Sequence, residues 1–234
     1  MREKVCVVAG VGPGIGKACC EFYANKGYQV VMLARSQTYL DEMTASMPAS
    51  TLAIAVDLST EATVNDAFAQ VHERFDNIDV LIYNAARGSF GSFLDVDPSE
   101  LEQNFAINTM GLLYCARAAA PAMIARGSGS IMVTGNTAAT RGGAKFATFA
   151  PSKSAARSLT QSMARELGPK QVHAAYLVID AAVDGPFGRN LLPDKPDDYF
   201  IQPSAIAEAI WYLDQQPQNC WTSELDLRPH GESW

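Results

Sequence analysis

The sequence contains no cluster of basic residues and no long apolar run. Because the formal net charge is −7, we expect no broad surface for nucleic acids. No stretch is long and apolar enough to span a membrane. The first apolar run begins almost at Met1, so we also expect no signal peptide. The expected location is therefore the cytoplasm.

Cysteines are few, their number is odd, and their spacing is unlike that of a metal site. Most of them lie in apolar runs, so we expect buried free thiols in a reducing compartment and no bound metal. The five are Cys6, Cys19, Cys20, Cys115 and Cys220.

The sequence also lacks internal repeats and low-complexity segments. Its 234 residues suit one domain, 1–234. Short apolar runs alternate with helical patterns, which predicts a Rossmann-like, doubly wound parallel sheet of about seven strands with helices on both faces. We expect strands near 5–9, 28–34, 51–56, 78–83, 130–134, 172–179 and 224–229. The longer expected helices are 37–46, 99–126, 147–167 and 203–214. Segment 180–202 is rich in Pro, Gly and Asp, and we expect a lid or substrate loop there.

A glycine-rich loop follows the first expected strand, with glycine at positions 10, 12, 14 and 16. A strand, a glycine loop and a helix place free backbone N–H groups beside a phosphate. Gly10 permits a tight turn, Gly14 a close approach of the ligand, and Gly16 close packing of helix on strand. The pattern favours a bound dinucleotide, and a purely structural turn is the alternative.

The second expected strand ends at Arg35, where a dinucleotide fold places the adenosine ribose. An acidic residue here would bind the 2′-hydroxyl group, and none is present. Arg35 offers a planar cation suited to a phosphate, so we expect NADP rather than NAD. A solvated surface arginine is the alternative. Other polar residues also follow expected strands, and we expect them to share one cleft: Asp57, Asn84, Asn136 and Asp180.

Over essentially its whole length the sequence resembles the short-chain dehydrogenase/reductase family. The family's Gly-x-x-x-Gly-x-Gly appears at Gly10, Gly14 and Gly16, and its Asn-Ala-Gly as 84–86 with Ala86 in place of the glycine. Its Tyr-x-x-x-Lys aligns with residues 149–153. The resemblance implies a cofactor site made of Gly10, Gly14, Ile15, Gly16, Arg35, Asp57, Leu58, Asn84, Ala85, Lys153 and Val183.

The resemblance also implies an active site of Asn108, Asn136 and Lys153. In the family a tyrosine transfers the proton, the lysine lowers its pKa and binds the ribose, and a serine positions the carbonyl. Here Phe149 stands at the tyrosine position and Asn136 at the serine position. No tyrosine lies between Tyr114 and Tyr176, so no shift of alignment restores the phenol. Losing a general acid commonly costs about 10²–10⁴ in rate.

Several groups are candidates for the missing proton donor. Lys153, or a water held between Lys153 and Asn108, could supply a proton, whereas the amide of Asn136 could only donate a hydrogen bond to a developing oxyanion. Asp184 is a further candidate acid in the expected lid. Phe149 has a simpler interpretation as an apolar residue that shapes the pocket.

The sequence therefore predicts an NADP-dependent oxidoreductase that transfers a hydride between nicotinamide and a small carbonyl or alcohol. The alternatives are an NADP-binding protein without redox turnover, or a repurposed fold for elimination or isomerisation. The resemblance implies a homodimer or homotetramer formed through the helices near 99–126 and 147–167. The residues expected on their outer faces are Leu112, Leu113, Ala116, Ala119, Ala120, Ala155, Ala156, Leu159 and Met163.

Overall fold

A single parallel sheet of seven strands forms the centre of the computed structural model, which describes residues 3–48 and 50–231. The strand order is β3-β2-β1-β4-β5-β6-β7, and every pairing is parallel. The strands are β1 (Val5–Ala9), β2 (Gln29–Ala34), β3 (Leu52–Ala55), β4 (Val80–Tyr83), β5 (Gly129–Asn136), β6 (Val172–Ile179) and β7 (Glu224–Leu227). This confirms the predicted fold class. Both ends of the expected domain, 1–234, lie outside the described residues.

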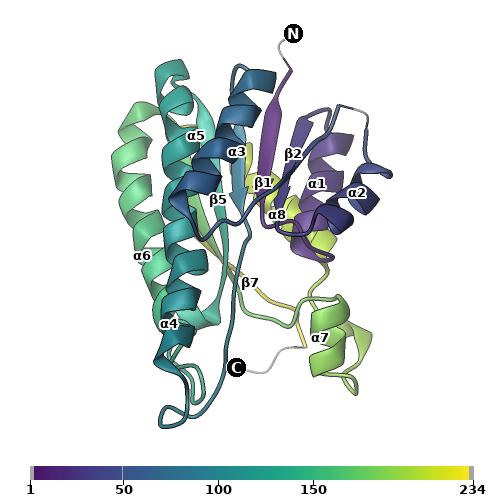
Figure 1. Cartoon of the computed structure of the whole chain (residues 1–234), viewed down its shortest axis with the longest axis vertical. Helices are drawn as coiled ribbons and strands as arrows, with labels where there is room; N and C mark the ends of the chain where they lie inside the picture. The colour runs from purple at the N-terminus through teal and green to yellow at the C-terminus, as the bar shows by residue number, and fades with distance from the viewer. Residues whose placement is uncertain (1–2, 49, 232–234) are drawn as a thin grey trace.

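Helices cover both faces of the sheet (Figure 1). Helices α3 (Glu61–Arg74), α5 (Leu112–Arg126) and α6 (Ala150–Leu167) pack on one face. Helices α1 (Ile15–Asn25), α2 (Gln37–Thr44) and α8 (Pro203–Asp214) pack on the other. The central strands β1 and β4 are buried throughout, as expected for strands covered on both sides.

The helix expected over 99–126 is interrupted. Asp97 caps α4 (Pro98–Phe105), as the Asp-Pro pair suggests, but a π-helical turn at Ala106–Gly111 separates α4 from α5. The turn lies close to the sheet, because a Cβ at Gly111 would overlap the Tyr83 hydroxyl and lie 2.6 Å from the Leu58 carbonyl oxygen. The Tyr83 hydroxyl donates to the Ile107 carbonyl oxygen at 2.5 Å.

Segment 180–202 is folded rather than an open loop. It contains helix α7 (Pro186–Leu191) and a 3₁₀ turn at Asp197–Tyr199, and Val183 bridges to Ile201. The Arg189 guanidinium donates to Asp184 at 2.6 Å and to Asp197 at 2.7 Å. These ion pairs tie the segment together and give it a fixed shape.

The expected outer face of α5 and α6 is only partly outside the core. Leu112, Ala116, Ala119 and Ala156 are buried against the sheet, which corrects their assignment to that face. The error arises because a helix rich in Ala and Leu has no polar stripe to mark its exposed side. Helix α6 also begins at Ala150, three residues later than expected, and β5 extends to Asn136.

The cysteine prediction agrees with the structure. Each of the five is a free thiol, four of them buried and Cys220 exposed. Within residues 3–48 and 50–231 no group of acidic, histidine and cysteine side chains could hold a metal ion. No helix among these residues has the length and apolar character needed to cross a membrane.

Candidate functional site

The glycine loop forms a tight cradle at the carboxyl end of β1. Gly10 has φ +96°, and a Cβ there would overlap the backbone nitrogen of Ala85. A Cβ at Gly16 would lie 2.7 Å from the Gly10 carbonyl oxygen. Around Gly12 and Gly14, by contrast, a Cβ would meet no described atom within 4 Å. The outer part of the loop therefore faces open space at the N-terminus of α1, which begins at Ile15.

Asn84 holds the ends of three strands together. Its side-chain amide donates to the Gly10 carbonyl oxygen at 2.8 Å and accepts from the Thr134 hydroxyl at 2.9 Å. Asn84 thus joins the carboxyl ends of β1, β4 and β5, as expected for a polar residue that follows one of several neighbouring parallel strands. The Thr134 hydroxyl is therefore used in this hydrogen bond.

Arg35 and Asp57 lie exposed at the ends of β2 and β3, on the same side as the cradle. The backbone N–H of Ser59 donates to the Asp57 carboxylate at 2.9 Å. Hydrogen bonds from Ser59 and, more weakly, the nearby charge of Arg35 lower the pKa of Asp57. Leu58 is buried, so only its backbone could meet a ligand.

Lys153 and Phe149 lie at the start of α6, one helical turn apart. The Lys153 side chain is buried, with 5% of its surface exposed, and its Nζ lies 5.9 Å from the centroid of the Phe149 ring. Its ammonium group has no hydrogen bond or ion pair to any described residue. Burial without a counter-ion lowers the pKa of Lys153 from 10.5 to about 8. The site therefore contains an amine that changes charge near neutral pH.

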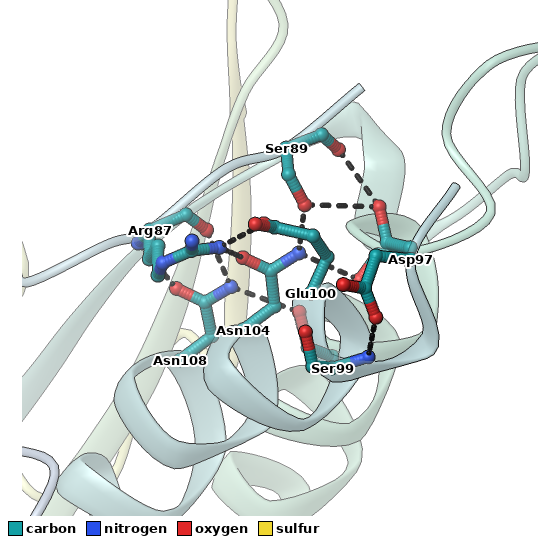
Figure 2. A network of polar contacts seen from close by, with 9 residues as sticks. Arg87, Ser89, Asp97, Ser99, Glu100, Asn104 and Asn108 are labelled. Carbon is teal, nitrogen blue, oxygen red and sulfur yellow. Dashed lines mark hydrogen bonds and ion pairs between the residues drawn. The ribbon is translucent and has the colours of Figure 1, made fainter. Parts of the chain in front are cut away.

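The side chain of Asn108 is buried in the π-helical turn, and both its amide oxygen and its NH₂ group have hydrogen-bond partners within the protein (Figure 2). Its amide accepts from the Arg87 backbone N–H at 2.9 Å and donates to the Arg87 carbonyl oxygen at 2.9 Å. It also donates to the Ser152 hydroxyl at 2.8 Å, and Ser152 in turn donates to the Phe149 carbonyl oxygen at 2.7 Å. Asn108 therefore connects the segment after β4 with the first turn of α6.

A polar network around Arg87 was not predicted from the sequence. The Arg87 guanidinium donates to Glu100 at 2.5 Å and to Asn104 at 3.1 Å. The same guanidinium holds the pKa of the Glu100 carboxyl below its usual range. A sequence signal existed, because Glu100, Asn104 and Asn108 follow one another at intervals of four residues and so share a helix face.

Asn136 ends β5 beside the segment that leads to α6. Its side-chain oxygen is buried without a hydrogen-bond partner among the described residues. This leaves the NH₂ group as the part of the side chain that can donate toward a ligand. Tyr176 lies close by, since a Cβ at Gly135 would overlap its hydroxyl. Burial raises the pKa of Tyr176, so this phenol does not replace the missing one.

Two residues of the 180–202 segment were expected to contribute to the site. Val183 is half-buried and fixed by its bridge to Ile201. Asp184 accepts hydrogen bonds from Arg189 and Gln202, and these contacts lower its pKa. Asp184 is therefore an ionised structural partner of Arg189, which corrects its candidacy as a catalytic acid.

The chain resembles known proteins over nearly its whole length. The sequence model of the short chain dehydrogenase family matches residues 4–190. An uncharacterised oxidoreductase of Staphylococcus saprophyticus is 28% identical over 233 residues, which are 98% of each chain. A short-chain dehydrogenase structure from Rhodopseudomonas palustris is 30% identical with a TM-score of 0.83, covering 98% of this chain and 100% of that one.

One similar structure contains a bound cofactor related to NADP. It is an alcohol dehydrogenase from the archaeon Thermococcus sibiricus in complex with 5-hydroxy-NADP, 27% identical with a TM-score of 0.86, covering 99% of both chains. The family match covers well over half of the sequence, and the fold and the glycine cradle agree with it. The chain belongs to the short-chain dehydrogenase/reductase family of oxidoreductases.

Proposed function

We propose that this protein is an NADP-dependent oxidoreductase that transfers a hydride between nicotinamide and a small carbonyl or alcohol substrate, with Lys153 in place of tyrosine as the proton-transferring group. The observation that carries the proposal is the buried Lys153 amine at the start of α6, without a counter-ion. Burying an ammonium group without a counter-ion is unfavourable, so we infer that the buried amine has a role in the site beyond stabilising the fold.

The residues at the carboxyl edge of the sheet fit the cofactor. Around Gly12 and Gly14 there is room for a pyrophosphate beside the N-terminus of α1, within the loop made by Gly10, Gly14, Ile15 and Gly16. Asp57 and Leu58 would border the adenine, and Asn84 and Ala85 the neighbouring part of the cleft. Lys153 would bind the nicotinamide ribose, and Val183 the carboxamide. Bound there, NADP supplies or accepts the hydride.

Arg35 supports NADP over NAD. It is exposed at the end of β2, where no acidic residue follows to repel a 2′-phosphate. A planar guanidinium can donate two hydrogen bonds to such a phosphate. The structures of relatives with NADP or its 5-hydroxy derivative are consistent with this preference.

Lys153 has the properties that proton transfer requires. With a pKa of about 8 it is mostly protonated at neutral pH, and it loses its proton more easily than an exposed lysine. In the reducing direction the carbonyl carbon accepts the hydride, and the Lys153 ammonium group gives a proton to the carbonyl oxygen, which becomes the hydroxyl group of the alcohol. The Asn136 NH₂ group donates a hydrogen bond to the same oxygen. Asn108 acts indirectly by positioning Phe149 and Lys153 through Ser152.

The missing phenol favours one alternative, an NADP-binding protein without redox turnover. In either case we propose a single cytoplasmic domain that forms a homodimer or homotetramer. The residues left for such an interface, once the buried ones are removed, include Leu113, Ala120, Leu159 and Met163.

The test is binding of NADPH and NADH, followed by nicotinamide fluorescence, for the wild type, Arg35→Ala and the control Arg74→Ala. Arg74 is exposed at the end of α3. We expect tight NADPH binding that weakens roughly tenfold or more in Arg35→Ala only, because a hydrogen bond to a charged group contributes about 1.5–3 kcal/mol. Assays with a panel of carbonyl substrates then distinguish an enzyme that turns over from a protein that only binds the cofactor. If neither cofactor binds, the oxidoreductase proposal is wrong.

A further inference from the structure

Three phenylalanine rings form an aromatic wall beside the candidate active site, made of Phe90, Phe146 and Phe149. The ring centroids of Phe90 lie 5.0 Å from Phe146 and 5.3 Å from Phe149, and those of Phe146 and Phe149 are 6.2 Å apart. Phe149 and Phe146 belong to a small apolar cluster that is separate from the two cores of the sheet. The wall is thus a feature of the loops at the carboxyl edge.

The wall is held in place by polar contacts between its two loops. The Gly91 N–H donates to the Lys145 carbonyl oxygen at 2.9 Å. The Thr148 hydroxyl donates to the Ser89 carbonyl oxygen at 3.0 Å. The buried amide of Asn104 donates to both the Ser89 hydroxyl, at 2.9 Å, and the Thr148 carbonyl oxygen, at 2.8 Å. Because the backbone on both sides is fixed, the rings are preorganised for a ligand.

Folding buries Phe149 but leaves Phe90 and the residues that follow it open. Phe90 exposes 53% of its surface, and Phe93 and Leu94 on the same segment expose 79% and 86%. A hollow of about 330 Å³ lies next to Phe146 and is lined mainly by small residues. Large aromatic surface left exposed on a fixed segment usually marks a binding site.

The wall reaches the reacting end of the candidate site through Phe149, whose ring lies 5.9 Å from the Lys153 amine. The charges of Arg87 and Glu100 pair with each other, so neither is free to bind a charged group of a substrate. We propose that the aromatic wall binds the aryl group of a carbonyl or alcohol substrate and thereby sets the specificity of the enzyme. The inference rests on the proposed function, because it places the carbonyl of that substrate at Lys153.

Aromatic rings favour an aryl group over an alkyl group of equal size. Edge-to-face and offset contacts between rings contribute about 0.5–1.5 kcal/mol beyond the burial of area. Phe90 already meets Phe146 and Phe149 edge-on or tilted, with interplanar angles of 63° and 69°. An added aryl ring would extend this arrangement over the open half of Phe90.

The experiment compares two unreactive amides of similar size, benzamide and cyclohexanecarboxamide, by calorimetry with and without NADP⁺. The variant is Phe90→Leu, which keeps an apolar side chain and removes the ring. The matched control is Tyr212→Leu, because Tyr212 is exposed on α8, away from the wall. The second readout is kcat/KM with NADPH for acetophenone and cyclohexyl methyl ketone.

We expect the wild type and Tyr212→Leu to bind benzamide about threefold or more tightly than cyclohexanecarboxamide, and to prefer acetophenone similarly. Phe90→Leu should lose this preference while NADPH binding is unchanged. Equal binding of the two amides by the wild type, or a preference that survives in Phe90→Leu, overturns the inference. The inference is also wrong if a second copy of the chain buries the aromatic wall. That result would appear as a concentration-dependent sedimentation coefficient that Phe93→Ala abolishes. Failure of cofactor binding with the benzamide preference intact would instead overturn only the proposed function.

Discussion

The side-chain amide of Asn108 pairs with both backbone polar groups of Arg87, accepting from its N–H and donating to its carbonyl oxygen, each at 2.9 Å. The pairing resembles that of two strands, but one partner is a side chain on a helix. It fixes the segment after β4 against the π-helical turn. Since Asn108 also donates to Ser152, one buried residue joins three elements around the candidate site.

Replacing Asn108 should therefore destabilise the fold. We expect Asn108→Leu to lower the free energy of unfolding by about 2–3 kcal/mol, because it leaves buried backbone groups of Arg87 without partners. Urea denaturation measures the change. The control is Asn65→Leu, at an exposed position on α3, which should change stability by less than about 0.5 kcal/mol. Equal losses in the two variants would contradict the assigned role.

Removing the charge of Lys153 should stabilise the protein without its cofactor. Burial lowers the pKa of Lys153 from 10.5 to about 8, so its ammonium group opposes folding at pH 7. We expect Lys153→Met to raise the free energy of unfolding at pH 7 by about 2–3 kcal/mol, below the upper bound of about 3.4 kcal/mol that 1.36 kcal/mol for each pKa unit sets.

The pH dependence of stability provides a second check on Lys153. Between pH 8 and 10.5 Lys153 holds a proton in the unfolded chain more often than in the folded one, so Lys153 contributes a gain of stability as the pH rises. The buried cysteines contribute with the opposite sign, because burial raises their pKa, so the contribution of Lys153 is the difference between the wild type and Lys153→Met. Lys153→Met should lose this slope, whereas the exposed control Lys170→Met should keep it. Parallel stability curves for the wild type and Lys153→Met over this range would show that the pKa of Lys153 is not lowered by folding.

Restoring the two family residues should raise turnover. We expect Phe149→Tyr combined with Asn136→Ser to increase kcat on simple carbonyls at least tenfold, because the phenol and hydroxyl add the family's proton donor and carbonyl-positioning group beside Lys153, and a well-placed general acid commonly contributes about 10²–10⁴ in rate. The new phenol would lie next to the Lys153 amine, whose positive charge favours ionisation of the phenol. Phe149→Leu with Asn136→Ser is the control without a phenol. No gain across a carbonyl panel would mean that the pocket is built for other chemistry.

Arg189 should control the stability of the segment between β6 and α8. Its guanidinium joins Asp184 and Asp197 and packs 4.2 Å from the centroid of Phe200. We expect Arg189→Met to speed limited proteolysis within 186–200 severalfold at pH 7, with Arg165→Met as an exposed arginine control. In the wild type the same region should open on acidification, because the lowered pKa of Asp184 adds stability that is lost as Asp184 becomes protonated. Unchanged cleavage in Arg189→Met would contradict this role.

Local sequence patterns were enough to predict the sheet, its helices and the glycine cradle. Apolar runs such as Val5–Ala9 are buried because strands covered on both faces exclude polar residues. Glycine is required at position 10 by a φ of +96° and at position 16 by the nearby Gly10 carbonyl oxygen, and the short glycine pattern encodes both requirements. The loss of the phenol at Phe149 was likewise evident from the sequence alone.

Which groups near Lys153 are available for chemistry depends on how the chain packs in three dimensions. Asp184 resembles a free acid in the sequence, but Arg189, five residues later, binds it once α7 folds. Asn108 resembles an active-site amide, but Arg87 and Ser152, far away in the sequence, occupy it. The pKa of Lys153 depends on the packing that excludes water and counter-ions from it. The contacts of Asn108 and the burial of Lys153 involve residues far apart in the sequence, and no local pattern specifies them.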